Sequence, residues 1–327
     1  MFERDKCDLC GECLHKCLNR SLSLEQSKAE FKKLYNGEFS SVLNDCVTCF
    51  ACEENCPRDA HPFDLILEQM EKWNKKPSSE QVIAGMEARY VSEQAYLAPA
   101  ISGTVISGCV FPKTHPHLFQ GAIFENSTIL KGRMIFCYVL FMHMGDSKVV
   151  ARRAPQMISN LAGTGAEEIV FFHDDCFALV HNIAPRLGIK VPFRAKHIVE
   201  HIRDWLKANP NLSKPLGIRI AYQRPCASRY SPEKEKAVDE IFDMLGVERV
   251  SRKYDRKQSL CCGGAFMASG RSPEELQEKN LKDALCAGTD EMVCLCPICV
   301  DMLKPKAQAL NIKLTHIIEL VNRALDI

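Results

Sequence analysis

Two cysteine runs of the same spacing open this chain. They are Cys7-x2-Cys10-x2-Cys13-x3-Cys17 and Cys46-x2-Cys49-x2-Cys52-x3-Cys56, the second followed by Pro57. Three thiols on one tight loop can each bind a different corner of an iron–sulfur cube, whereas the fourth lies too far along the chain to close the same cube easily. Eight thiols at one repeated spacing therefore predict two cubane [4Fe–4S] clusters. Zinc sites use paired Cys-x2-Cys hooks, so a zinc pair or a disulfide framework explains these runs poorly.

The fourth cysteine of each run is expected to bind the cluster of the other run, as it does in two-cluster ferredoxins. One cluster is therefore assigned the ligands Cys7, Cys10, Cys13 and Cys56. The other cluster is assigned the ligands Cys46, Cys49, Cys52 and Cys17. Leu18 stands where this pattern usually has proline, so the first run departs slightly from the type.

A second group of cysteines lies in the last third of the chain. Its members are Cys226, Cys261, Cys262, Cys296 and Cys299. The adjacent pair Cys261-Cys262 cannot comfortably bind one iron of a cube, so these thiols predict a more open or bridged iron–sulfur assembly. Gly263-Gly264 follow the pair and let the backbone approach an inorganic core or adopt a positive φ.

Composition narrows the class of protein. The chain has 327 residues, enough for two or three domains. Its 42 basic and 41 acidic residues nearly cancel, which argues against nucleic-acid binding. The sequence shows no 18-residue apolar run and no signal-peptide core at its start. Eighteen cysteines in such a chain indicate metal ligation in a reducing cytoplasm, and oxygen-sensitive cubanes favour an anaerobic host.

An internal repeat organises the rest of the chain. The matching segments are 169–176 with 292–299, and 197–200 with 316–319. The predicted domains are residues 1–76 (ferredoxin-like), 77–96 (linker helix), 97–209 (first copy) and 215–327 (second copy). Pro210 to Pro215 is the expected linker between the copies.

Strand-like and helix-like segments alternate in each copy. The expected strands include 103–109 and 218–222, and the expected helices include 64–75, 79–96, 231–245 and 272–288. Ser231 and Ser272 are the expected N-caps of the last two helices, each followed by proline. This alternation predicts an α/β protein with a small parallel sheet in each copy, preceded by an α-rich segment that holds the two cubanes.

The second cysteine group resembles the cysteine-rich CCG domain of heterodisulfide reductases, and the order of parts resembles those enzymes along essentially the whole chain. The resemblance implies that Cys226, Cys261, Cys262, Cys296 and Cys299 bind a non-cubane [4Fe–4S] cluster. It implies an oxidoreductase that passes electrons through two cubanes to this cluster, which reduces a disulfide or oxidises a thiol. The alternative is an electron-relay subunit of a larger anaerobic respiratory or flavoprotein complex, with no substrate chemistry of its own.

The same resemblance implies partners and a location. A flavoprotein or a membrane cytochrome or quinone-linked subunit is the expected partner, and a small thiol or disulfide is the expected substrate. The protein is expected to be cytoplasmic, with any membrane association made through a partner subunit. Gly163 to Ala166 form a helix-ending turn before a strand, the wrong order for nucleotide phosphates, so flavin or nicotinamide should come from the partner.

The first copy keeps only part of the cysteine pattern. It retains Cys109 and Cys176, but His143 falls in the place of the double cysteine and His173 in the place of Cys296. Two thiolates and two imidazoles suit tetrahedral zinc, so Cys109, His143, His173 and Cys176 form a candidate zinc site. The alternative is a decayed site with buried thiols. A single complete copy favours the relay function over two-site splitting of a disulfide.

Other residues carry lesser expectations. Cys137, Cys286 and Cys294 are expected to be buried apolar residues without metal. Arg224 is a candidate for contact with substrate, because it lies two residues before Cys226. The basic residues before Cys261 are either a funnel for an anionic substrate or a solvated loop; they are Arg249, Arg252, Lys253, Arg256 and Lys257.

Overall fold

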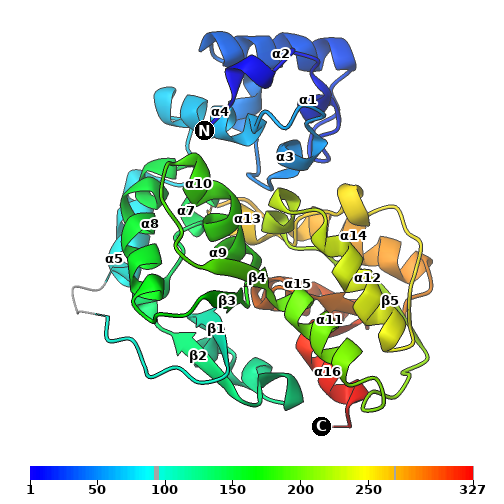
Figure 1. The fold of residues 1–327 in the computed structure, drawn as a ribbon. Coiled ribbons are helices and arrows are strands. Elements are labelled where there is room, and N and C mark those ends of the chain that lie inside the picture. Colours follow the sequence, from blue (N-terminus) through cyan, green and yellow to red (C-terminus); the bar gives the residue numbers. More distant parts are fainter. Residues whose placement is uncertain (92–95, 269, 327) are drawn as a thin grey trace.

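The computed structural model describes residues 1–91, 96–268 and 270–326, and consists of an N-terminal group of helices followed by two parallel sheets (Figure 1). Each sheet has four strands, in the orders β2-β1-β3-β4 and β6-β5-β7-β8. Since the two orders correspond strand by strand, the repeat in the sequence is also a repeat in the fold. The expected α/β class with parallel sheets is confirmed.

The N-terminal segment is helical. Its helices are α1 (Glu12–His15), α2 (Leu24–Asn36), α3 (Ala51–Asn55), α4 (Pro62–Lys72) and α5 (Glu80–Tyr90). A capping box between Ser23 and Gln26 starts α2, and Gly37 in the left-handed region ends it. Helices α4 and α5 correspond to the two expected in this region, although α5 ends earlier than expected and residues 92–95 lie outside the described chain.

The first copy contains the first sheet. Its strands are β1 (Thr104–Cys109), β2 (Ser127–Lys131), β3 (Glu168–Phe171) and β4 (Arg194–His197). Its helices are α6 (Phe111–Thr114), α7 (Leu140–His143), α8 (Ser147–Ala162), α9 (Asp174–Ala178), α10 (Ala184–Arg186) and α11 (Ile198–Ala208). The segment 163–166 joins α8 to β3, as the sequence predicted.

The second copy repeats this arrangement. Its strands are β5 (Ile218–Gln223), β6 (Val247–Arg249), β7 (Glu291–Cys294) and β8 (Lys313–His316). Its helices are α12 (Lys234–Met244), α13 (Gly264–Ala268), α14 (Glu274–Cys286), α15 (Pro297–Ala309) and α16 (Ile317–Ala324), with a 3₁₀ helix, η7 (Cys226–Tyr230), after β5.

Both predicted serine N-caps of this copy need correction. The N-cap of α12 is Glu233, because η7 runs directly into Ser231, whose carbonyl oxygen accepts a turn hydrogen bond from the Lys234 N–H at 3.2 Å. The N-cap of α14 is Pro273, and the Ser272 hydroxyl accepts a hydrogen bond from the Glu274 N–H at 3.3 Å.

Two histidines explain part of the repeated sequence. His197 and His316 are the N-caps of α11 and α16, and each forms a capping box with the glutamate three residues later. In the sheets, His197 pairs with Phe171 and His316 pairs with Cys294. The matching segments 197–200 and 316–319 therefore mark the same strand-to-helix turn in each copy.

One apolar core joins the N-terminal helices to the first copy. Phe50, Phe63 and Ile66 belong to the same buried cluster as Phe141 and Phe171. Figure 1 shows α1 to α4 at one end of the molecule, with α3 on the side that faces the two copies, whereas α5 lies beside α8 of the first copy. Helix α3 also packs against η7, which starts with Cys226. The N-terminal thiols are therefore held against the second cysteine group.

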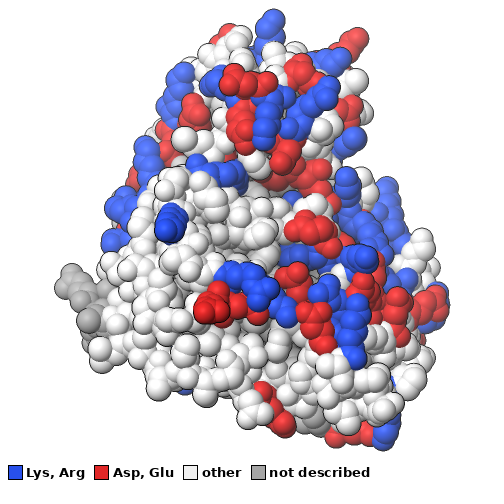
Figure 2. Space-filling view, viewed as in Figure 1, with Lys and Arg blue, Asp and Glu red and all other residues white. Residues whose placement is uncertain are grey.

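The visible surface carries mixed charge. Figure 2 shows basic and acidic residues interleaved over the N-terminal helices and over the second copy, with no broad area of one sign. This pattern agrees with the formal net charge of +1. In the described ranges, every helix is too short or too polar to cross a lipid bilayer.

Candidate functional site

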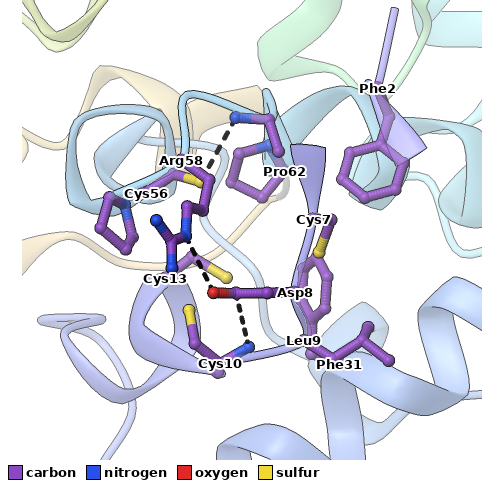
Figure 3. A pocket seen from close by; sticks show the side chains of 13 residues that line it. Phe2, Cys7, Asp8, Leu9, Cys10, Cys13, Phe31, Cys56, Arg58 and Pro62 are labelled. Carbon is purple, nitrogen blue, oxygen red and sulfur yellow. Dashed lines mark hydrogen bonds and ion pairs between the residues drawn. The ribbon is translucent and has the colours of Figure 1, made fainter. Parts of the chain in front are cut away.

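Four thiols of the N-terminal segment line one small cavity. They belong to Cys7, Cys10, Cys13 and Cys56, and Figure 3 shows their sulfur atoms around the same space. Gly11 makes the turn before α1 with φ 74°, and a Cβ there would lie 2.8 Å from the backbone nitrogen of Lys28. The Ala60 N–H donates a hydrogen bond to the Cys56 sulfur at 3.4 Å. Such donors are a common feature of iron–sulfur ligands.

A second cavity is adjacent to the first. Its lining includes Cys17, Cys46, Cys49 and Cys52, and Cys13 lines both cavities. The fourth cysteine of each run thus lies beside the first three of the other run, the arrangement that the ligand assignment requires. The Thr48 N–H donates to the Cys46 sulfur at 3.4 Å, and the Asn19 amide donates to the Cys49 sulfur at 3.6 Å.

Burial keeps these thiols protonated in the metal-free chain. Burial raises the pKa of the Cys46 thiol to about 12 and that of the Cys49 thiol to about 11. Unpaired thiolates in this environment would carry a large desolvation cost. A bound cationic iron core must therefore displace the protons, as metal binding at cysteine sites generally does.

The five cysteines of the second group form one continuous set of contacts; we call them the CCG thiols. Cys226 and Cys262 each donate a hydrogen bond to the Cys261 sulfur, and these bonds lower the pKa of the Cys261 thiol well below its ordinary value. Cys299 lies within hydrogen-bonding reach of both Cys262 and Cys296. The five sulfurs therefore form one connected set, in which the pKa values of the Cys261 and Cys296 thiols are lowered and favour the thiolate, the form that binds metal.

Gly263 shapes the loop that carries the adjacent cysteines. Its φ is 102°, and its N–H donates to the Cys261 sulfur at 3.3 Å. A Cβ at this position would lie 2.5 Å from the Pro273 side chain and 2.9 Å from the Gln277 amide. The Gln277 amide in turn donates to the Cys262 carbonyl oxygen at 2.9 Å, which fixes the backbone of the pair.

Gly263→Ala is expected to destabilise the protein by more than about 1 kcal/mol and to reduce the iron bound by the CCG thiols, because the substitution combines a disfavoured φ with a steric clash. Gly217→Ala is the matched control, since Gly217 has φ 60° but a Cβ added there would have no heavy atom within 4 Å. Urea denaturation and iron analysis under anaerobic conditions measure both effects. Equal stability and iron content in the two variants would contradict the role of the Gly263 contact.

The second cavity and the CCG thiols are close enough to interact electrostatically. The charge of Cys261 acts on Cys49, and the charge of Cys49 acts on Cys226. Arg229 lies between the same elements, where its charge opposes the effect of burial on the pKa of the Cys17 and Cys49 thiols. The three groups of thiols therefore follow one another through the molecule, from the first cavity to the second and then to the CCG thiols.

Arg224 does not face a substrate, contrary to one expectation from the sequence. Its side chain is buried, and its guanidinium donates to Glu54 of α3 at 2.6 Å and to the Ser228 carbonyl oxygen at 3.2 Å. Arg229 also pairs with Glu54, at 3.2 Å, and donates to the Ser259 carbonyl oxygen at 2.6 Å. Both arginines therefore hold the N-terminal segment against the second copy, a role that sequence reasoning missed.

The arginines before Cys261 are also paired with protein groups. Arg249 and Arg256 form ion pairs with Asp239 at 2.9 and 2.6 Å. Arg252 is buried and donates to the Asn280 side chain at 2.8 Å and to the Tyr222 carbonyl oxygen at 2.9 Å. Since these cations already have partners, the structure offers no support for an anionic funnel built from them.

His143 does not lie with the other three residues of the candidate zinc site. Its Nδ1 lies 2.7 Å from the Thr48 carbonyl oxygen, and its ring centroid lies 4.4 Å from that of Phe50. The histidine therefore faces the N-terminal segment. Tertiary packing against Phe50, far away in sequence, decides its position, and the repeat alone could not reveal this contact.

Of the remaining members of that set, Cys109 and Cys176 stay together, and only His173 turns its Nε2 toward another cysteine. Cys109 and Cys176 share a hydrogen bond, and Cys176 also contacts Cys137, which the sequence interpretation had treated as a packing residue only. His173 Nε2 lies instead 3.1 Å from the sulfur of Cys296. No three or more His, Cys, Asp or Glu side chains within residues 1–91, 96–268 and 270–326 converge as one metal ion requires. The four residues therefore do not form the predicted zinc site. This test does not apply to a cubane, because its four thiolates each bind a separate iron and need not surround one metal ion.

Of the other cysteines, Cys137 and Cys294 are buried as expected, but Cys286 at the end of α14 is exposed, so that prediction is wrong. The buried residues of α14 are Gln277, Asn280, Leu281 and Ala284. Cys286 lies off this face, which the helical period could have revealed.

Comparisons with known proteins agree with this arrangement of cysteines. A family model described as a cysteine-rich domain, CCG, matches residues 220–304, which contain all the CCG thiols. The chain is 23% identical over 394 aligned residues to a subunit of the dihydromethanophenazine:CoB–CoM heterodisulfide reductase of Methanosarcina barkeri, covering 100% of this chain and 95% of the relative. The subunits of the same name from Methanosarcina acetivorans and Methanosarcina mazei are each 21% identical, with the same coverage.

A solved structure described as an Asp/Glu racemase of Yersinia pestis is 16% identical with a TM-score of 0.33, covering 68% of this chain and 98% of that one, and this weak likeness carries no argument. The cysteine-rich domain and the full-length similarity to the Methanosarcina subunits agree with each other and with the convergence of the thiols. The chain is therefore similar to heterodisulfide reductase subunits over its whole length and contains a cysteine-rich CCG domain.

Proposed function

We propose that this chain is an iron–sulfur oxidoreductase of the heterodisulfide reductase type, which reduces a small disulfide or oxidises the corresponding thiols. One observation carries the proposal: thirteen cysteines from the N-terminal segment and the second copy form three neighbouring groups of converging thiols. Full-length similarity to subunits of heterodisulfide reductases supports the same redox function.

The residues fit the proposed clusters in number, type and surroundings. Cys7, Cys10, Cys13 and Cys56 would hold one cubane, and Cys17, Cys46, Cys49 and Cys52 would hold the other. The CCG thiols would hold a non-cubane [4Fe–4S] cluster. When bound, the cubanes would carry electrons, and the third cluster would supply iron that binds sulfur of the substrate.

The protein's own groups have defined tasks in this proposal. Backbone N–H groups of Thr48, Ala60 and Gly263 donate to ligand sulfurs and so stabilise their negative charge. Burial excludes water from the ligands and lowers the local dielectric constant. The buried pairs of Arg224 and Arg229 with Glu54 fix the N-terminal thiols relative to the CCG thiols.

An electron-relay subunit is the second candidate, and burial of the CCG thiols favours it. Cys261, Cys262, Cys296 and Cys299 are only 4–6% exposed, whereas Cys226 is partly exposed. A substrate sulfur would have to reach this enclosed group, while electron transfer would not require such access. In this case the chain would pass electrons between a flavoprotein and a membrane cytochrome or quinone-linked subunit.

Anaerobically prepared protein should bind roughly twelve iron atoms, the number for three four-iron clusters. A reduced dye should then reduce the CoB–CoM heterodisulfide or another small disulfide, and added thiol should change the paramagnetic spectrum of the third cluster. Clusters without any thiol response or disulfide reduction would favour the relay function. Colourless protein with little iron would contradict both candidates.

A further inference from the structure

His173 in the first copy occupies the position of Cys296 in the second. The two residues are 123 positions apart, the offset of the repeat in this region. His173 is the N-cap of α9 after β3, and Cys296 is the N-cap of α15 after β7. Each residue therefore lies at the carboxyl edge of its own sheet, where the chain turns from strand to helix.

These equivalent positions face each other across the two copies. His173 Nε2 lies 3.1 Å from the Cys296 sulfur, and the residues are 8% and 6% exposed. A second contact joins the same parts of the molecule, since His115 Nε2 lies 3.2 Å from the Asp301 carboxylate on α15. The first copy, which lacks the complete cysteine set, thus places an imidazole directly on a thiol of the complete set.

Contacts on the other sides of the ring hold His173 in this orientation. The Phe111 ring centroid lies 4.7 Å from the imidazole centroid. The Asp175 carboxylate lies 3.9 Å from Nδ1, on the side of the ring away from Cys296. A thiolate only accepts hydrogen bonds, so Nε2 must be the protonated nitrogen that donates to sulfur when Cys296 is deprotonated.

We propose that His173 is a positioning residue that donates a hydrogen bond to the Cys296 thiolate and raises the reduction potential of the cluster bound by the CCG thiols. The inference rests on the proposed function. A hydrogen bond to a thiolate withdraws negative charge from the ligand, and this stabilises the more negative, reduced state. Hydrogen bonds to sulfur are one of the factors that set the potentials of iron–sulfur clusters.

The imidazole differs from the backbone donors to this group. The N–H groups of Gly263 and Ala265 donate to Cys261, but a backbone donor remains after substitution of the side chain. His173 is a side-chain donor, so its effect can be removed without changing a ligand. The degenerate copy would then control the electron affinity of the complete copy instead of binding a second cluster.

His173→Phe in the full-length, anaerobically reconstituted protein should lower the midpoint potential of the third cluster. We expect a shift equal to about a tenfold change in the reduction equilibrium, or about 59 mV for one electron. His173→Gln keeps an N–H donor and should recover part of the shift. His115→Phe is the matched control, because His115 contacts α15 at Asp301 and not at a cysteine. Redox titrations followed by paramagnetic resonance, with iron analysis, give the comparison.

An unchanged midpoint in an iron-loaded His173→Phe variant, or an equal shift in His115→Phe, would overturn the inference. If His173→Phe fails to assemble the cluster, wild-type protein labelled with ¹⁵N-histidine tests whether an imidazole contacts the cluster ligand. Its third cluster should show a weak nitrogen coupling in electron–nuclear double resonance, and absence of this coupling overturns the inference. Absence of the cluster from wild-type protein would instead refute the proposed function.

Discussion

Replacing Cys261 with alanine is expected to abolish disulfide reduction while leaving the two N-terminal clusters in place. Cys261 accepts hydrogen bonds from Cys226 and Cys262, so it connects Cys226 to the other CCG thiols. Its loss removes a thiol whose pKa is lowered and leaves the adjacent Cys262 without that contact. Bound iron should fall from roughly twelve to roughly eight atoms per chain, the number for two cubanes.

Cys286→Ala provides the matched control for this experiment. Cys286 is an exposed cysteine of the same copy and lies outside the CCG thiols, so its loss should change neither iron content nor activity. Paramagnetic spectra of the reduced proteins separate the cubane signals from the third signal. Full turnover by the Cys261→Ala protein would refute the catalytic part of the proposal. Loss of all three signals would show that the groups of thiols do not assemble independently.

The cysteine groups were predictable because their geometry is mostly local. A Cys-x2-Cys-x2-Cys loop brings three thiols together whatever the rest of the chain does, and Cys13 and Cys49 follow this rule. The repeat likewise predicted two sheets of the same topology, since alternation of strand and helix is visible in each copy. Local rules could also have placed Cys286 outside the buried face of α14.

Contacts between distant segments were not predictable in this way. Arg224 meets Glu54 across 170 positions, so its proximity to Cys226 in sequence suggested a substrate contact that the fold replaces with an ion pair. His143 meets Thr48 across 95 positions. In both cases the N-terminal segment supplies the partner, and no pattern within one copy indicates that this segment packs there.

The first copy gains a clearer structural role from these contacts. Its Phe141 and Phe171 share one apolar core with Phe50 and Phe63 of the N-terminal segment. Its Asp174 is buried and lies 2.6 Å from Lys234 of the second copy. The first copy therefore lacks the complete cysteine set but supplies surfaces that join the other two parts.

Glu54 connects the N-terminal segment to the second copy through buried charge. Its carboxylate lies 2.6 Å from Arg224 and 3.2 Å from Arg229, and all three side chains are less than 5% exposed. Glu54 belongs to α3, which also contains Cys52, whereas both arginines flank or belong to the segment that starts with Cys226. The carboxylate therefore sits where the second cavity meets the CCG thiols.

Glu54→Gln should destabilise the protein by about 3–5 kcal/mol, because it removes the buried carboxylate that pairs with Arg229 and leaves Arg224 with its ion pair to Glu235 alone. Glu168→Gln is the control: Glu168 pairs with Arg194 at 2.9 Å on the surface, and loss of an exposed pair costs about 1 kcal/mol or less. Urea midpoints measured anaerobically on iron-loaded protein give the difference. Equal effects of the two substitutions would show that Glu54 is not a major link between the parts. Glu54→Gln should also slow the reduction of the third cluster by dye-reduced cubanes. Both effects together would show that the ion pairs that stabilise the fold also set the separation between the groups of thiols.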